Sequence, residues 1–78
     1  MARYFLHVRT PGGLAPDGEG VELARLGDLH REVVKVAADL IGGDPAAADW
    51  RFEVADEMGR TVLSERLGAL VPRPAASS

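Results

Sequence analysis

The sequence predicts an α+β fold: a two-layer sandwich in which one helix lies across one face of a four-stranded, mostly antiparallel sheet. The expected element order is β-β-α-β-β. Residues 26–41 carry apolar side chains at steps of three and four, which is the spacing of one helix face. The segments on both sides instead alternate apolar and polar residues, as half-buried strands do. Because no other segment is long enough for a substantial helix, each strand must bury its apolar face against this one. The expected core stripe of the helix is Leu26, Leu29, Val33, Val36 or Ala37, and Leu40.

The composition limits what this chain can be. Its 78 residues suit one small domain, which buries only roughly 60% of its unfolded surface. The absence of Cys excludes disulfides, thiolate zinc sites and cysteine nucleophiles. A net charge of −3 argues against general nucleic-acid binding, which needs a basic surface. The apolar runs are too short to span a membrane, and the first residues do not resemble a signal peptide, so we expect a cytoplasmic protein.

The first strand is expected at residues 3–9, where aromatic and branched side chains are dense. Alternation divides this strand into two faces. The face toward the helix carries Tyr4, Leu6 and Val8. The opposite face carries Phe5, His7 and Arg9. Because this second set is mixed in character, it predicts a partly open surface.

Residues 10–20 contain two Pro and four Gly and are predicted to form a loop, followed by a brief strand at residues 21–23. A phosphate-binding loop is not indicated, because the glycines lack its spacing and the loop is acidic. In the helix that follows, Asp28 either caps a start at Leu29 or lies in the first turn of a helix that starts near Arg25. Gly42 and Gly43 are expected to end the helix with a left-handed cap, before Pro45.

The strongest hairpin signal lies between residues 50 and 65. Residues 50–55 alternate, with Trp50, Phe52 and Val54 on one face and Arg51 and Glu53 on the other. Residues 56–59 form the predicted turn, in which Gly59 suits a left-handed position, and residues 60–65 form the return strand. The four strands are expected in the spatial order 2-1-3-4. Residues 67–71 are too short to classify, residues 1–71 make one domain, and residues 72–78 are predicted to be a disordered tail.

Three blocks in this order resemble a family of small bacterial proteins of unknown function. They are RYFLHVR at the start, DGEGVEL before the helix, and WRFEVADEMGRTVL at the end. The likeness covers residues 3–63 and departs at Arg25, where an acidic helix cap is expected. It implies no activity, cofactor or catalytic residue. The element order is also similar to that of antitoxin-type domains with a partial RNase H-like fold, an analogy that does not define function.

Four groups of side chains are candidate sites of chemistry. His7 beside a carboxylate is a base or ligand in one interpretation and an ordinary sheet histidine in the other, which we favour. His30 has no second His four residues away, so the helical metal spacing is missing. The acidic cluster of Asp17, Glu19 and Glu22 lacks the calcium-loop pattern and suits a solvated turn. The hydroxyls of Ser64, Ser77 and Ser78 have no identifiable base, so we predict no catalytic, cofactor-binding or metal-binding residue and no enzyme.

Two functions remain from different classes. The first is a non-enzymatic protein-interaction module that forms a homodimer or binds another protein. It would use an exposed sheet edge or the face carrying Phe5, His7, Arg9, Arg51 and Glu53. The competing arrangement is that residues 67–71 fold back over Phe5. The second function is an antitoxin-like regulatory module that binds a small ligand or nucleic acid through a local patch of Arg3, Arg9, Arg51 and Arg60.

Overall fold

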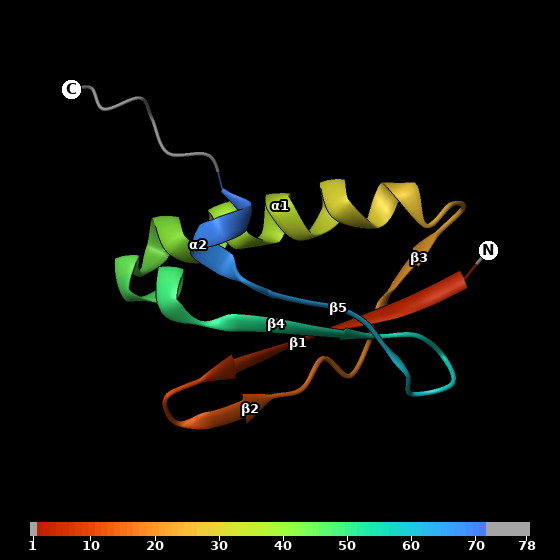
Figure 1. The fold of residues 1–78 in the computed structure, drawn as a ribbon, viewed down its shortest axis with the longest axis horizontal. Helices are drawn as coiled ribbons and strands as arrows, with labels where there is room; N and C mark the ends of the chain where they lie inside the picture. The colour runs from red at the N-terminus through yellow and green to blue at the C-terminus, as the bar shows by residue number, and fades with distance from the viewer. Residues whose placement is uncertain (1, 72–78) are drawn as a thin grey trace.

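The fold is an α+β structure of two layers, as the sequence predicts. A computed structural model describes residues 2–71, and one helical layer lies on one face of an antiparallel sheet (Figure 1). The elements in chain order are β1 (Ala2–Thr10), β2 (Gly13–Ala15), β3 (Val21–Leu23), α1 (Gly27–Gly43), the 3-10 helix η1 (Pro45–Asp49), β4 (Arg51–Ala55), β5 (Thr61–Arg66) and α2 (Leu67–Leu70). The predicted tail at residues 72–78 lies outside the described residues.

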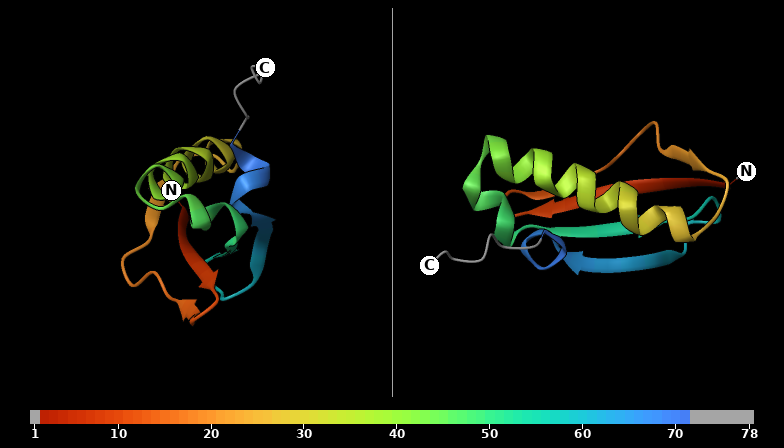
Figure 2. Two further views of the ribbon diagram at one scale, coloured as in Figure 1. Left: turned by 90° about the vertical axis from the view of Figure 1, so that its left-hand side faces the viewer. Right: turned by 90° about the horizontal axis from the view of Figure 1, so that it is seen from above.

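The sheet is built around β1, which has strand neighbours on both edges. One edge of β1 pairs with β4, and β4 in turn pairs with β5. The other edge is shared, because β2 pairs with the end of β1 and β3 pairs with its beginning. The predicted order 2-1-3-4 is therefore confirmed as β3-β1-β4-β5, and β3 and β5 lie at opposite edges in the right-hand view of Figure 2. Strand β2 was not predicted, because Pro and Gly dominate the loop that contains it.

The core lies between the helical layer and the sheet. Its largest fully buried side chains are Phe52, Leu67, Val33 and Val54. Alternation along β1 is as predicted: Tyr4 is buried, and Leu6 and Val8 pack against the same core. The open face of the sheet carries the other side chains of β1. No helix among residues 2–71 has the length and apolar character needed to cross a membrane.

The prediction for α1 needs two corrections, and of the two placements left open for Asp28 the one in the first turn is confirmed. Leu26 is 60% exposed, because it precedes the first helical residue and turns away from the sheet. Val36 and Leu40 are only partly buried, because the line that faces the narrow sheet is Leu29, Val33 and Ala37. The helix begins at Gly27, so Asp28 lies in its first turn.

The end of α1 also differs from the prediction. Gly42 and Gly43 are the last residues of the helix, and neither adopts a positive φ. The chain leaves the helix at Asp44, whose φ of −152° is extended. The Asp44 carboxylate then accepts a hydrogen bond from the backbone N–H of Ala46 at 3.1 Å and caps η1, with Pro45 at its start. A cap for the next helix therefore replaces the expected glycine cap.

The hairpin between β4 and β5 forms as predicted. Gly59 has a φ of +83°, the left-handed conformation expected of it. The Asp56 carboxylate accepts hydrogen bonds from the backbone N–H groups of Met58 and Arg60, both at 2.9 Å. The return strand is Thr61–Arg66, one residue later than predicted at each end, and its register shifts opposite Val54 and Ala55.

Residues 67–71 belong to the helical layer. Leu67 is fully buried, and α2 packs against α1 and η1. This packing is close, since a Cβ on Gly68 would lie 2.8 Å from the carbonyl oxygen of Ala48. The alternative in which this segment covers Phe5 is wrong, because Leu67 fills the core on the other face of the sheet.

Candidate interaction surface on the open sheet face

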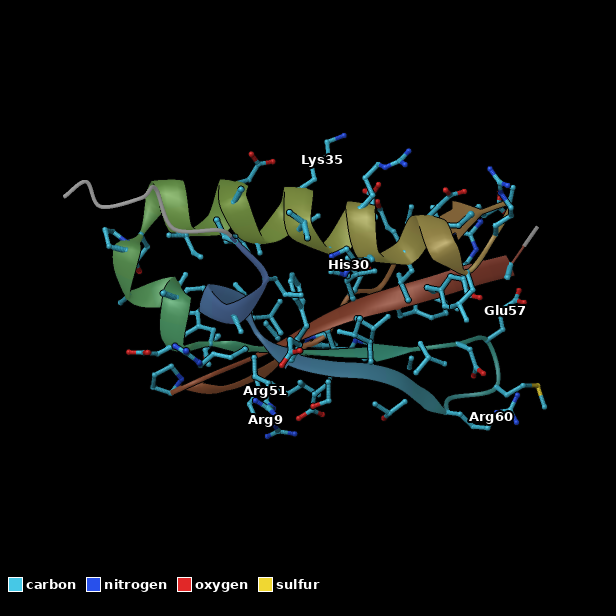
Figure 3. The ribbon with its side chains drawn as sticks, turned by 45° about the horizontal axis from the view of Figure 1, so that its top comes forward. Arg9, His30, Lys35, Arg51, Glu57 and Arg60 are labelled. Carbon is cyan, nitrogen blue, oxygen red and sulfur yellow. The ribbon has the colours of Figure 1, made fainter. Side chains whose placement is uncertain are left out.

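The pairing of β1 with β4 brings all five predicted surface residues together. Directly paired residues of antiparallel strands point to the same side of the sheet. Phe5 is opposite Ala55, His7 is opposite Glu53, and Arg9 is opposite Arg51. Figure 3 shows Arg9 and Arg51 projecting on the side of the sheet away from α1. We call this surface, formed by Phe5, His7, Arg9, Arg51 and Glu53, the open face.

An ion pair crosses the open face from β1 to β4. Arg9 Nε lies 2.7 Å from Glu53 Oε2, and Arg9 Nη2 lies 3.3 Å from Oε1. The hydrogen bond and charge of Glu53 raise the pKa of Arg9. The hydrogen bond from Arg9 is also the main reason that the pKa of Glu53 is lowered, and the charges of Arg9, Arg51 and His7 add to it. Glu53 is therefore a fixed carboxylate with cations around it, which does not suit an acid or base in catalysis.

Arg51 has a different environment from Arg9. Its Nε donates to Ser64 Oγ on β5 at 3.1 Å, and within residues 2–71 no carboxylate forms an ion pair with it. Leu14 on β2 is paired with Arg9 and is 44% exposed, so it extends the same row of side chains. The sequence argument missed Leu14 and Ser64. Placing Leu14 requires β2, whereas Ser64 was accessible from the alternation of the return strand.

His7 is held by two neighbours on the sheet. Its ring stacks on Phe5, with the centroids 6.3 Å apart and the planes 9° from parallel. Its Nδ1 accepts a hydrogen bond from the backbone N–H of Asp17 at 3.0 Å. One ring nitrogen is thus engaged with the backbone, which supports the interpretation of His7 as a structural sheet histidine over that of a base.

Asp17 fastens the loop before β3 to the edge of β1. One carboxylate oxygen accepts from the backbone N–H of Leu6 at 3.1 Å. The other accepts from the N–H groups of Glu19 and Gly20, also at 3.1 Å each. Gly20 adopts a φ of +75°, and a Cβ there would lie 2.8 Å from the carbonyl oxygen of Tyr4. The DGEG segment therefore has a structural role, in which a side chain replaces strand pairing where β2 has ended and β3 has not begun.

The other predicted site residues are dispersed. Glu22 pairs with Arg3 at 3.1 Å, so it does not face Asp17 as a second metal ligand would. His30 is exposed on α1, away from the open face (Figure 3). Within residues 2–71 no three His, Asp or Glu side chains are placed to hold a metal ion. Ser77 and Ser78 lie outside the described residues.

The four arginines of the predicted basic patch do not form one cationic surface. Arg3 pairs with Glu22, Arg9 with Glu53, and Arg60 with Asp56. Arg60 also lies at the hairpin, at the opposite end of the sheet from Arg9 and Arg51 (Figure 3). Three of the four charges are therefore compensated by a neighbouring carboxylate.

Comparison with known proteins identifies a family for this chain. No curated protein and no solved structure matches the chain. A family model described as "Domain of unknown function (DUF6894)" matches residues 3–68, which spans the sheet, α1 and the start of α2. Because that match covers most of the sequence, the chain belongs to this uncharacterised family.

Proposed function

We propose that this protein is a non-enzymatic interaction module that forms a cytoplasmic homodimer through its open face. The single observation that supports this is the one-sided cover of the sheet. Helices α1 and α2 and the turn η1 all lie on one side, as the end-on view in Figure 2 makes plain. The other side carries an aromatic ring, an exposed Leu14 and arginines, a combination that is enriched at protein interfaces.

The distribution of charge favours a second copy as the partner. At one end of the open face, Arg51 lacks an ion-pair partner within residues 2–71. Toward the other end of β1, Glu19 lacks one within the same residues, and its backbone carbonyl accepts a hydrogen bond from Arg3. A two-fold axis over the middle of the face would place the cationic end of one copy on the acidic end of the other, which is an isologous contact.

The second candidate, an antitoxin-like module for nucleic acid or a small ligand, has less support. Nucleic-acid binding needs several cations free to displace counterions, whereas Arg3, Arg9 and Arg60 are each occupied by a carboxylate. A salt titration of binding to duplex DNA and to RNA tests this alternative directly. A steep loss of affinity with salt would favour it over the protein interface.

Sedimentation equilibrium at micromolar concentration tests the homodimer. We expect a mass of twice the chain mass of 8.3 kDa. Arg51→Glu should weaken the dimer by about tenfold or more, since it removes one cross-interface attraction and adds a repulsion. Phe5→Glu tests the same face, with far-UV circular dichroism to verify folding.

Two control variants match these changes on the other side of the molecule. Lys35→Glu makes the same charge reversal on the exposed side of α1, and Leu26→Glu places a carboxylate at a 60% exposed apolar position. Both should leave the dimer unchanged. A monomeric wild-type protein, or a dimer that survives both Arg51→Glu and Phe5→Glu, would refute the proposal.

A further inference from the structure

One edge of the sheet is covered by other segments, and the other edge is free within residues 2–71. The edge of β1 is closed along its length by β3, by the Asp17 carboxylate and by β2. The opposite edge belongs to β5, a strand of six residues. Within residues 2–71 no segment pairs with the outer side of β5. An edge strand of this length presents unpaired backbone donors and acceptors.

The ladder between β4 and β5 determines which backbone groups point outward. The backbone N–H of Leu67 donates to the carbonyl of Trp50 at 2.9 Å, so these two residues occupy a hydrogen-bonded position. Hydrogen-bonded and non-hydrogen-bonded positions alternate along an antiparallel pair. Arg66, which precedes Leu67, and Ser64, two residues before Arg66, therefore turn their backbone N–H and C=O groups away from β4. Both N–H groups therefore lie on the free edge. Their side chains lie on the open face, opposite Arg51 and Glu53.

This edge has few of the usual devices that prevent strand addition, apart from Glu65, whose side chain lies on the helix side opposite Phe52. Within β5 there is no Pro and no Lys, and the one register irregularity lies at its far end, opposite Val54 and Ala55. The side chain of Val62 is 41% exposed, and the half-buried Leu63 lines the helix side of the edge. A strand placed here would find Leu63 and Glu65 on the helix side and Arg66 with Ser64 on the open face.

We propose that β5 binds an extended segment of a partner protein as an added antiparallel strand with alternating acidic and apolar residues. The acidic side chains would lie beside Ser64 and Arg66 on the open face, and the apolar ones beside Leu63. Arg66 is suited to this role because both of its contacts, with the Ala48 carbonyl and with the 87% exposed Asp49, are long at 3.5 Å. Backbone hydrogen bonds would supply the affinity and the side chains the selectivity.

A second copy of β5 fits this edge less well than an acidic strand. A two-fold axis perpendicular to the sheet pairs residues that point to the same side. If Leu63 pairs with itself, Arg66 faces another arginine, Arg60. If Ser64 pairs with itself, Arg66 faces Val62, and if Glu65 does, two carboxylates meet. None of these registers gives Arg66 an acidic partner.

The test is fluorescence anisotropy with a labelled peptide of alternating Glu and Val that has the six-residue length of β5. We expect saturable binding by the full chain. A block peptide, with all Glu before all Val, has the same composition and should not bind. A peptide of alternating Lys and Val tests the charge preference and should bind at least about tenfold more weakly, because its cations meet Arg66 and Arg51.

A matched pair of variants at one position separates backbone from side-chain effects. Ser64→Pro removes the outward N–H without removing a backbone hydrogen bond to β4, and should weaken binding by about tenfold or more. It also removes the hydroxyl that accepts from Arg51, and Ser64→Ala removes the same hydroxyl. Ser64→Ala keeps that N–H and should bind within about twofold of wild type. Arg66→Glu should weaken binding of the Glu/Val peptide and strengthen that of the Lys/Val peptide. Circular dichroism verifies that each variant is folded.

Three results would overturn the proposal. The first is no binding of the alternating peptide at up to millimolar protein. The second is equal binding by folded Ser64→Pro and by wild type. The third is a wild-type dimer that Ser64→Pro dissociates, which would assign the edge to a second copy. The outcome does not depend on the open-face dimer, because Phe5→Glu disrupts that dimer on β1, which β4 separates from β5.

Discussion

His7 and Asp17 are linked by reciprocal hydrogen bonds between β1 and the loop before β3. The His7 ring accepts the backbone N–H of Asp17 at 3.0 Å, and the Asp17 carboxylate accepts the N–H of Leu6, the residue beside His7, at 3.1 Å. Each residue thus satisfies a backbone group of the other's segment. The contact closes the gap between β2 and β3 and fixes the position of the loop against the open face.

Asp17→Ala should lower the free energy of unfolding by about 1–3 kcal/mol. The change leaves the N–H groups of Leu6, Glu19 and Gly20 without their acceptor. Urea denaturation measures the loss. The matched control is Glu19→Ala, whose carboxylate makes no hydrogen bond or ion pair within residues 2–71 and should change stability by less than about 0.5 kcal/mol. Equal effects of the two substitutions would contradict the role given to Asp17.

The same carboxylate should make stability depend on pH. Burial raises the pKa of Asp17, but the hydrogen bonds from the backbone N–H groups of Gly20, Leu6 and Glu19, with the nearby charge of His7, outweigh it and lower the pKa below its usual 3.8. A depressed folded pKa contributes stability above the unfolded pKa and loses it as pH falls through the folded value. The stability difference between wild type and Asp17→Asn should therefore shrink between pH 7 and pH ~3. A difference that stays constant or grows over this range would disprove this linkage.

Gly20→Ala should destabilise the fold by about 1–3 kcal/mol or more. The positive φ of +75° is unfavourable for alanine, and its Cβ would lie 2.8 Å from a backbone oxygen, that of Tyr4, which cannot move aside cheaply. Gly18→Ala provides the control in the same loop, because nothing lies within 4 Å of a Cβ there and its φ is not positive. Thermal unfolding of the two variants distinguishes them. A Gly20→Ala protein as stable as Gly18→Ala would show that the loop can retreat from β1.

Leu67→Ala should cost about 2–5 kcal/mol of stability, because Leu67 is fully buried between α1, η1 and the sheet. Leu26→Ala removes the same atoms from a position that is 60% exposed and should cost less than about 0.5 kcal/mol. Guanidinium titration of both variants measures the contrast. A small effect at Leu67 would indicate that α2 is not part of the core.

The periodic parts of the sequence predicted their structures well. Alternation in β1 and β4 determines which side chains of each strand face the core. Because paired residues of the two strands point to the same side of the sheet, the remaining side chains of both strands together form the open face. The prediction of which face of α1 is buried was less accurate. Apolar residues occupy more of the helix surface than the narrow sheet can cover, so periodicity alone could not choose Ala37 over Val36 and Leu40.

The non-periodic parts could not be predicted. Strand β2 has three residues in a Gly-rich loop, and only the edge of β1 beside it makes it a strand. The role of Asp17 depends on a backbone N–H that lies eleven residues earlier in the chain. The segment at Leu67 is too short for a pattern, and its burial follows from the position of η1.

The central position of β1 has a consequence for the order of folding. Its two short partners, β2 and β3, follow within the first 23 residues, but the pairing that places Arg9 beside Glu53 spans 44 residues. During synthesis β1 therefore lacks its main neighbour until β4 has emerged, and non-local pairing of this kind slows folding. We expect the β4–β5 hairpin and α1 to form early, and the docking of β1 onto β4 to limit the rate.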